Sequence, residues 1–382
     1  MASIKKEQYA IAPGSRVLVT GANGFIGSHV VQQLLSLGYV VRGTVRSQKP
    51  WLEELFRSKY GPNSFESVVI PDLSDYDTLS KAMKDVSGVI HVASDVSFSP
   101  NADEVIPKVV SATETILEAA AKQSEGSIQR VVLTSSASAA ALPQPGVEGI
   151  VITERKYSLG VDSITLDTWN DATVKAAFDE GTPADAKPFT VYVASKTEGE
   201  RAAWKWVKNN KPPFVFNAVL PYYTLGEVLH PEIAGSTMKW AANLLDGDTT
   251  AFGFPGRTYK SYFPCPYTFR VDPFADKFSK IEFVDVADLA RVHVVGLLHP
   301  EAKSERLFAF ASTFTWKEFV GILRKLRPGH TEIPSPPENE LRDLSEIVPA
   351  RRAKDLLQAV FGGSGWVGLE ESIQAGVDSL GY

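Results

Sequence analysis

The chain has 382 residues, of which 44% are apolar, and carries a formal net charge of −6. This apolar content can bury a large core, in one large α/β domain or in two smaller ones. The sequence contains no basic run of the kind that binds a phosphate backbone, and no apolar stretch near the roughly 20 residues that span a bilayer. Nucleic acid and a membrane are therefore excluded as expected partners.

Cysteine and histidine usage limits the redox and metal chemistry that we expect. The single cysteine, Cys265, stands between two prolines, excludes an intrachain disulfide and suits a reducing compartment. The first residues contain no apolar signal region, so we expect a soluble, cytoplasmic protein. The six histidines are scattered without metal-ligand spacing, and we predict no metal site.

From Arg16 onward, short β-branched runs alternate with longer helical patterns, which is typical of βαβ units and a parallel sheet. Right-handed crossovers then predict an α/β fold with a Rossmann-type, doubly wound sheet. The predicted strands of the first half are 16–20, 40–45, 68–70, 89–92 and 130–134, and the predicted helices are 24–37, 75–85 and 109–122.

The alternation breaks after Thr134 and returns later in the chain. Residues 135–188 are rich in small residues and proline, with one helical candidate at 168–180. Thr315 and Glu318 form a capping box that opens a helix ending near Leu326. The remaining predicted elements are helices 192–209 and 286–298 and strands 214–220 and 306–310.

This pattern divides the chain into two functional parts. We expect a Rossmann core that binds NADP over residues 1–220, with an excursion at 137–188. A smaller, substrate-binding region covers mainly 221–382, of which 281–312 rejoins the core. An aromatic, proline-rich stretch at 222–283 serves either irregular core packing or substrate lining.

A glycine-rich turn indicates a dinucleotide site. Gly21, Gly24 and Gly27 follow a predicted strand and open a predicted helix, the context that this fingerprint requires. They permit a tight turn, a close approach of the backbone to a pyrophosphate, and close packing of helix on strand. The pyrophosphate would lie at the helix N-terminus, against the backbone of Asn23, Phe25 and Ile26.

The second strand distinguishes the two nicotinamide dinucleotides. It contains Arg42 and Arg46 and is followed by no carboxylate before Glu53, which favours NADPH over NADH. Arg46, at the strand end, is the better ligand for a 2′-phosphate, while Arg42 caps the strand edge. Asp72 follows the third strand with Leu73, and either contacts the adenine or forms an Asx-type turn before the next helix.

A tyrosine and a lysine four residues apart indicate the chemistry. Tyr192 and Lys196 lie on one face of the predicted helix, where the ammonium is expected to lower the phenol pKa from its usual ~10. The fifth strand ends in Thr134, Ser135 and Ser136, so Ser136 either orients a carbonyl or forms a strand-end turn. Hydride transfer to a carbonyl develops negative charge on oxygen, which a hydroxyl pair stabilises. The residues support carbonyl reduction or its reverse.

These motifs in combination resemble the extended short-chain dehydrogenase/reductase family, more closely its dihydroflavonol-reductase-like branch and its fungal NADPH-dependent aldehyde and carbonyl reductases. The likeness runs from about Gly14 to the C-terminus, interrupted near 250–280. It implies that Ser136, Tyr192 and Lys196 form a catalytic triad and that Arg46 binds the 2′-phosphate. The other residues that it places along the cofactor are Asp72, Leu73, Ala93, Ser94, Thr134, Ser135, Pro221 and Tyr222.

The chain departs from the family pattern at three places. Ala112 stands where many relatives have glycine, the pair Tyr222 and Tyr223 is bulky, and segment 249–280 is long where specificity is set. Substrate identity therefore does not transfer from the resemblance. We expect an apolar pocket to which Phe98, Trp169 and Tyr223 contribute.

Three hypotheses follow. The leading one is an NADPH-dependent reductase that acts on a small aldehyde or ketone. The second is a sugar-nucleotide epimerase or dehydratase that retains NAD, against which the basic second strand and the apolar substrate region argue. The third is an NADPH-sensing regulator without turnover, against which the Ser-Tyr-Lys set argues. A monomer and a homodimer are both compatible with the sequence.

Overall fold

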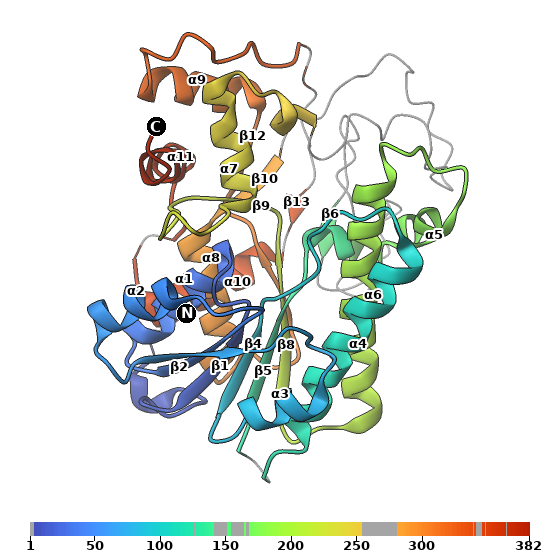
Figure 1. The fold of residues 1–382 in the computed structure, drawn as a ribbon, viewed down its shortest axis with the longest axis vertical. Coiled ribbons are helices and arrows are strands. Elements are labelled where there is room, and N and C mark those ends of the chain that lie inside the picture. Colours follow the sequence, from blue (N-terminus) through green and yellow to red (C-terminus); the bar gives the residue numbers. More distant parts are fainter. Residues whose placement is uncertain are drawn as a thin grey trace.

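Seven parallel strands form the central sheet, in the order β11-β8-β5-β4-β1-β2-β3 (Figure 1). The strands are β1 (Arg16–Thr20), β2 (Val40–Val45), β3 (Phe65–Val69), β4 (Gly88–His91), β5 (Arg130–Thr134), β8 (Val215–Pro221) and β11 (Arg306–Ala309). The computed structural model describes residues 4–124, 127–140, 151–153, 164–165, 168–253, 281–338, 340, 346–347, 349–363 and 365–382. The predicted parallel sheet is confirmed.

Helices cover both faces of this sheet (Figure 1). One face packs against α1 (Phe25–Ser36), α2 (Pro50–Tyr60), α8 (Val286–Leu298) and α10 (Ala350–Phe361) in a single apolar cluster. The other face packs against α3 (Tyr76–Ala82), α4 (Ala102–Ala121) and α6 (Lys187–Asn210), with α5 (Asp171–Phe178) beside α6. The sheet is therefore doubly wound, as a Rossmann-type fold requires. Within the described residues, no helix combines the length and apolarity needed to cross a membrane.

A second layer of structure lies beyond the carboxyl edge of the sheet (Figure 1). Its three-stranded sheet has the order β12-β10-β9 and packs against three helices around a core of aromatic side chains. Its elements are β9 (Tyr223–Leu225), α7 (Ser236–Ala242), β10 (Ile281–Asp285), β12 (Ser312–Phe314), α9 (Trp316–Leu326) and α11 (Leu369–Ser379). A third, short sheet joins β6 (Val151–Thr153), β7 (Ile164–Thr165) and β13 (Glu346–Ile347).

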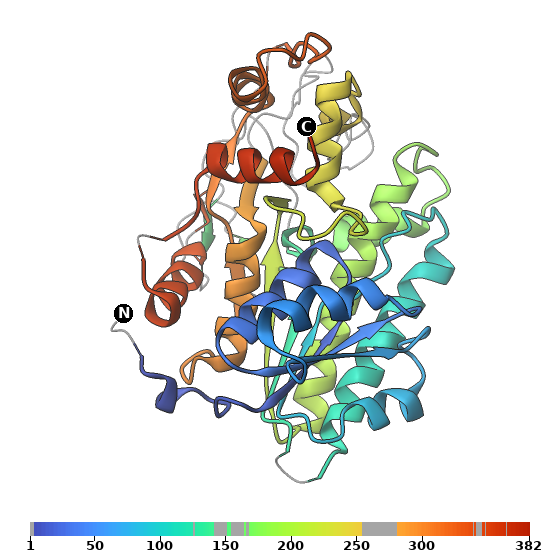
Figure 2. The same cartoon turned by 60° about the vertical axis from the view of Figure 1, so that its left-hand side comes forward.

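Helix α8 connects the two layers. Asp285 caps its N-terminus by accepting from the Ala287 N–H at 2.8 Å, and its second oxygen accepts from the Ser372 hydroxyl of α11 at 2.8 Å. Figure 2 shows α11 lying across the end of α8. The segment 281–312 therefore belongs to both layers. Strand β10 joins the second sheet, whereas α8 and β11 join the central layer.

Most predicted elements are present, with shifted ends. The third strand begins three residues earlier than predicted, at Phe65, and α4 begins at Ala102. The capping box of Thr315 and Glu318 is confirmed, with α9 ending at Leu326. Helix α2 was not predicted, although Pro50 at its first turn is a usual helix start signal.

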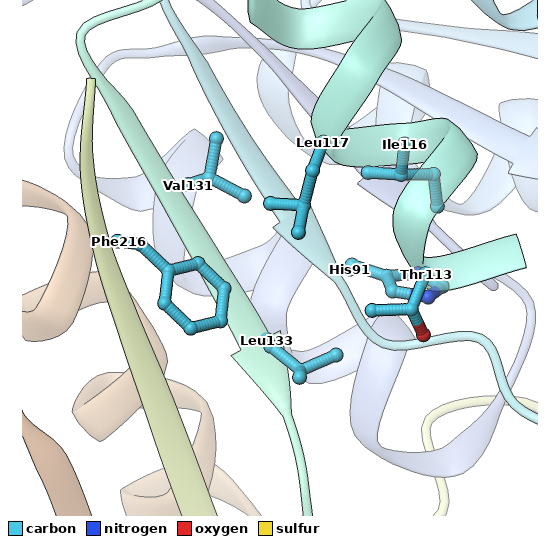
Figure 3. Close-up of a pocket in the computed structure, with 7 residues that line it drawn as sticks. All are labelled: His91, Thr113, Ile116, Leu117, Val131, Leu133 and Phe216. Atoms are coloured by element: carbon cyan, nitrogen blue, oxygen red, sulfur yellow. The ribbon is translucent and has the colours of Figure 1, made fainter. Parts of the chain in front are cut away.

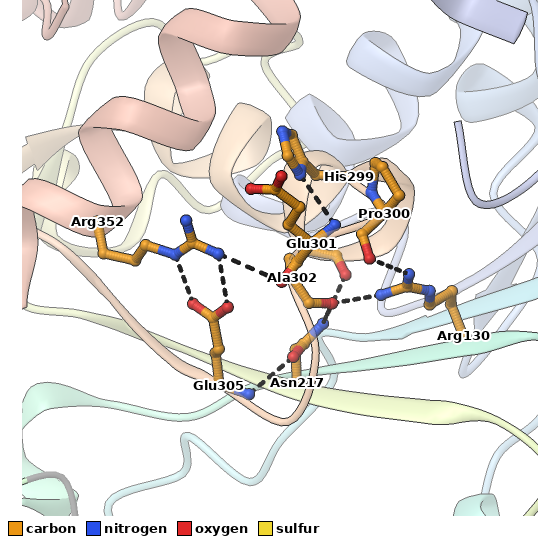
Figure 4. Close-up of polar contacts among 9 residues, drawn as sticks. Arg130, Asn217, His299, Pro300, Glu301, Ala302, Glu305 and Arg352 are labelled. Carbon is orange, nitrogen blue, oxygen red and sulfur yellow. Dashed lines mark hydrogen bonds and ion pairs between the residues drawn. The ribbon is translucent and has the colours of Figure 1, made fainter. Parts of the chain in front are cut away.

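Polar side chains fix the connection from α8 into β11 at the amino edge of the sheet (Figure 4). Arg130 donates to the carbonyls of Ala302 and Pro300, while Asn217 donates to Ala302 and accepts from the Glu305 N–H at 2.9 Å. Arg352 holds Glu305 through two hydrogen bonds, of 2.8 and 2.9 Å. These bonds fix the start of β11, and therefore the position of Arg306.

The glycine turn between β1 and α1 permits no larger residue at its third glycine. A Cβ atom added at Gly27 would lie 2.1 Å from the Gly21 carbonyl oxygen. Gly21 has a φ of +67°, which favours glycine, and a Cβ there would lie 3.1 Å from the Ala93 backbone. The turn is therefore packed on itself and against the end of β4.

We predict that Gly27→Ala lowers the free energy of unfolding by about 1–3 kcal/mol, because the new methyl group meets backbone atoms that cannot move away. The matched control is Gly321→Ala, at an exposed helical position with nothing within 4 Å of the added Cβ. It should raise stability by about 0.5–1 kcal/mol. Urea denaturation measures both. A Gly27→Ala variant as stable as the wild type would contradict the packing described here.

Candidate active site

The carboxyl ends of four central strands bring the candidate site residues together. In the ladder, Thr20 pairs with His91, and Thr134 at the end of β5 pairs with Val219 of β8. Helix α6 crosses near this edge, and the Lys196 ammonium donates to the Thr134 carbonyl at 3.3 Å. The structure thus places the glycine turn, the Thr134–Ser136 turn and the Tyr192–Lys196 face at one edge of the sheet.

Aromatic rings surround Tyr192. The Phe98 ring lies 5.0 Å from it, centroid to centroid, and Phe189 lies at 6.1 Å. Phe98 also lies 5.8 Å from Trp240 of α7, so one ring bridges the proton-donor candidate and the second layer. Phe98 has a φ of +52°, an unfavourable backbone conformation for an aromatic residue that tends to occur at functional sites.

Burial governs the titration of Tyr192. Loss of solvation raises the pKa of Tyr192 to about 12. The expectation that Lys196 brings this pKa below its usual value is therefore wrong in net direction, because desolvation of the phenolate dominates. The phenol is consequently protonated at neutral pH.

Lys196 is also buried, with 7% of its surface exposed. Burial lowers the pKa of Lys196 to about 8, while the nearby Glu200 carboxylate acts to raise it. The ammonium still predominates at neutral pH, and it is the only charged group of the predicted triad.

Two buried histidines support the strand ends. The Thr20 hydroxyl accepts from the N–H groups of Val92 and Ala93, both at 3.1 Å, so its one proton goes to Nδ1 of His91 at 2.8 Å. His91 lies beneath α4, beside Thr113 and among otherwise apolar side chains that leave no space for a water molecule (Figure 3). Burial lowers the pKa of His91 to about 3, so this imidazole is neutral.

His293 of α8 plays the same part for β5. Its Nδ1 bonds the Leu289 carbonyl at 2.8 Å and must donate, so its Nε2 accepts from the Thr134 hydroxyl at 2.7 Å. Burial lowers the pKa of His293 to about 4, which keeps the ring neutral. Neither histidine was singled out in the sequence, because each is buried by elements distant along the chain.

The serines after β5 have distinct partners. The Ser135 hydroxyl donates to Glu200 of α6 at 2.7 Å. The Ser136 hydroxyl accepts from the Ser138 N–H at 3.3 Å and lies 2.8 Å from the Ser138 hydroxyl. When Ser138 donates in that pair, the proton of Ser136 is available to a ligand. Ser138 was missed in the sequence and is a second hydroxyl of this turn.

The N-terminus of α1 fits a dinucleotide pyrophosphate. Gly24 is the N-cap and provides no side-chain capping bond, so the first helical N–H groups are available to an anion. A Cβ atom at Gly24 would lie 3.3 Å from the Gly21 carbonyl oxygen, so a larger residue would be tightly packed there. Asn23, Phe25 and Ile26 flank this N-terminus.

The two arginines of β2 differ in their partners. Arg42 pairs with Glu66 at 2.8 Å and donates to the carbonyls of Ala82 and Lys84. It therefore ties β2 to β3 and to the end of α3. Arg46 is exposed just after the strand and forms no ion pair with any residue that the structure describes. Of these two arginines, Arg46 is therefore the one accessible to an anion, and it also acts electrostatically on Asp95.

The remaining cofactor candidates occupy positions around the same edge. Asp72 forms the Asx-type turn, accepting from the N–H and hydroxyl of Ser74, and remains exposed beside Leu73. Both interpretations of Asp72 are compatible with that geometry. Ala93 and Ser94 lie just after β4, Pro221 is the last residue of β8 and pairs with Ala309 of β11, and Tyr222 follows it.

Two of the three substrate candidates lie in packed surroundings. Trp169 is contacted by the guanidinium groups of Arg306 at 4.5 Å and Arg201 at 5.4 Å. Tyr223 is 1% exposed and packs edge-on against Phe314 and Trp316. Of the three, only Phe98 is in ring contact with Tyr192. Within the aromatic stretch 222–283, residues 254–280, which include Cys265, fall outside the described residues.

Comparison with known structures shows the same fold. The yeast methylglyoxal/isovaleraldehyde reductase Gre2 in complex with NADPH superimposes with a TM-score of 0.71 at 24% identity, covering 96% of this chain and 98% of that one. Vestitone reductase from alfalfa gives 0.65 at 20% identity, with 95% and 97% coverage.

Sequence comparison identifies the family. Residues 17–162 match the model of the NAD dependent epimerase/dehydratase family. The ketoreductase adrE of Penicillium roqueforti is 42% identical, over 97% of this chain and 98% of its own. Aldehyde reductase 2 of Sporidiobolus salmonicolor is 36% identical, over 97% of each chain. With the Rossmann-type sheet and the glycine turn, these matches mean that the chain belongs to the NAD-dependent epimerase/dehydratase family of extended short-chain dehydrogenases/reductases.

Proposed function

We propose that this protein reduces an aldehyde or ketone to an alcohol with NADPH, and that Tyr192 is the proton donor. The observation that supports the proposal most directly is the position of Tyr192. Its helix is tied to the end of β5 by Lys196, and its ring lies against Phe98 at the edge where the glycine turn opens α1. Similarity to ketoreductases and aldehyde reductases along nearly the whole chain adds support.

The protonation states suit reduction. Bound NADPH supplies a hydride, and the carbonyl oxygen then needs a proton. A phenol with its pKa raised to about 12 is protonated at neutral pH and still more acidic than an alcohol, so it donates readily to a developing alkoxide. Ser136 would orient the carbonyl, and the Lys196 ammonium would stabilise the phenolate that remains.

The substrate we propose is apolar or aromatic. Phe98 and Trp240 form a continuous series of rings from Tyr192 to α7, and Phe189 packs near Tyr192 on α6. These rings favour planar or bulky apolar groups. Residues of the second layer would supply most of the substrate-binding region. Trp169 and Tyr223 belong to packed clusters, so we assign direct substrate contact to Phe98 first.

NADPH is the cofactor we propose, with Arg46 at the 2′-phosphate. Arg42 is held by Glu66 and by two carbonyls, whereas Arg46 is exposed at the strand end, where the ribose of a dinucleotide lies in this fold.

Tyr192→Phe should lower kcat for carbonyl reduction by about 10²- to 10⁴-fold, since it removes only the donated proton. NADPH binding, followed by fluorescence titration, should remain within about twofold. Tyr76→Phe is the matched control, because it removes a phenol of α3 that lies beside Lys122, at the C-terminal end of α4, and it should leave kcat unchanged.

A Tyr192→Phe variant that keeps most of its activity would contradict the assignment of the donor. A wild-type protein that consumes neither NADPH nor NADH with aliphatic, aromatic and α-dicarbonyl substrates would contradict the reductase itself and favour the epimerase or regulator.

Arg46→Ala should weaken NADPH binding about 10- to 100-fold and leave NADH binding unchanged, because a charge-assisted contact to the 2′-phosphate is lost. Arg42→Ala is the control, four residues earlier and within β2. It breaks the ion pair with Glu66 and should reduce stability without changing the NADPH-to-NADH preference. Kinetics with both cofactors distinguish the two variants. A preference that follows Arg42 instead would contradict the assignment.

A further inference from the structure

A buried carboxylate lies one helical turn beyond Lys196. Glu200 follows Lys196 by four residues and Tyr192 by eight, so all three occupy one face of α6. Glu200 is 1% exposed. A carboxylate so far from water is stable only when its oxygens are hydrogen-bonded or paired with a cation.

Both oxygens of Glu200 have partners. One accepts from Arg306 Nε at 2.7 Å and from Trp204 Nε1 at 3.0 Å. The other accepts from the Ser135 hydroxyl at 2.7 Å and from Arg306 Nη2 at 3.0 Å. Arg306 therefore binds Glu200 through two parallel hydrogen bonds, and the remaining lone pairs reach α6 itself and the turn after β5.

Arg306 extends this cluster to the segment before α5. Its guanidinium lies 4.5 Å from the Trp169 ring, and Nη1 donates to the Thr168 carbonyl at 3.1 Å. Arg306 is the first residue of β11, whose start is fixed by the bonds of Asn217 and Arg352 to Glu305 (Figure 4). The position of Glu200 is thus fixed by Arg306 of β11, an outer strand of the central sheet whose start is itself held by hydrogen bonds.

We infer that Glu200 is a positioning residue for carbonyl reduction: it holds the Ser135–Ser136 turn opposite Tyr192 and provides the negative charge that faces Lys196, while Arg306 fixes it in place. This inference rests on the proposed reductase function. Glu200 acts through Ser135 and Lys196 and does not contact the reacting carbonyl.

The charges around Lys196 support the second part of this role. The titratable and charged groups that face Lys196 are Tyr192 and Glu200 on α6, His91 on β4, His293 on α8 and, behind Glu200, Arg306 on β11. Burial and Lys196 itself lower the pKa of each histidine, so both are neutral. Glu200 is therefore the group in this set that opposes the effect of burial on the pKa of Lys196.

The test compares Glu200→Gln with Glu198→Gln in the full chain. Glutamine keeps the size of the side chain and removes its charge, so the Lys196 ammonium should be lost at a lower pH. We expect the alkaline limb of the kcat profile to move to lower pH and kcat above neutral pH to fall about tenfold or more, with the KM for NADPH changed little. Glu198 pairs with the partly exposed Arg201 on the same helix, and its variant should keep the wild-type profile.

Ser135→Ala provides a second variant, since Glu200→Gln leaves Arg306 without its carboxylate and risks misfolding. Ser135→Ala keeps the ion pair and removes only the bond that joins Glu200 to the turn after β5. It should lower kcat about tenfold while the alkaline limb stays in place.

Several outcomes would overturn the inference. One is a Glu200→Gln variant whose kcat falls by the same factor at every pH. Another is a wild-type profile in Glu200→Gln together with wild-type kcat in Ser135→Ala. If Glu200→Gln does not fold, wild-type kcat in Ser135→Ala alone overturns it. A wild-type enzyme without carbonyl reductase activity would instead contradict the proposed function, which separates the two failures.

Discussion

All strands of a parallel sheet run in the same direction, so their carboxyl ends lie along one edge of the sheet. The backbone groups just beyond the last ladder bond at that edge need partners. Here the Thr20 hydroxyl accepts from two N–H groups after β4, and Lys196 donates to the carbonyl that ends β5. The side chains that complete the sheet are therefore the ones that surround the candidate site, and satisfying the backbone also orders the residues for chemistry.

The candidate site contains more buried polar and ionisable side chains than the motif of Tyr192 and Lys196 alone implies. Tyr192 and Lys196 are both displaced from their usual pKa values by desolvation, in directions that favour the neutral form of each. For the tyrosine this displacement preserves the proton that reduction requires. For the lysine it works against the charge, so an opposing carboxylate has a clear physical purpose.

Local patterns predicted the fold well, because β-branched runs and the glycine turn depend on neighbours in sequence. The same holds for the face shared by Tyr192 and Lys196, which helical geometry dictates. Contacts between residues far apart in the sequence, and the burial that they cause, could not be predicted. The pairing of Glu200 with Arg306 joins residues 106 positions apart, and the support of Thr134 by His293 spans 159. The pKa of Tyr192 was misjudged for the same reason, since desolvation depends on the whole tertiary environment. The positive φ of Phe98 has no sequence signal, as that conformation is unusual for an aromatic residue.

The distance along the chain between Glu200 and Arg306 also bears on how the protein is made. Synthesis proceeds from the N-terminus, and the first part of a chain folds before the last part exists. Before β11 has left the ribosome, the Glu200 carboxylate of α6 cannot pair with the Arg306 guanidinium. Burying that charge without its partner is strongly unfavourable. The polar contacts of Glu200 beside the candidate site are therefore complete only after residue 306 has been translated. Native packing around Glu200 thus depends on a residue from the last quarter of the chain.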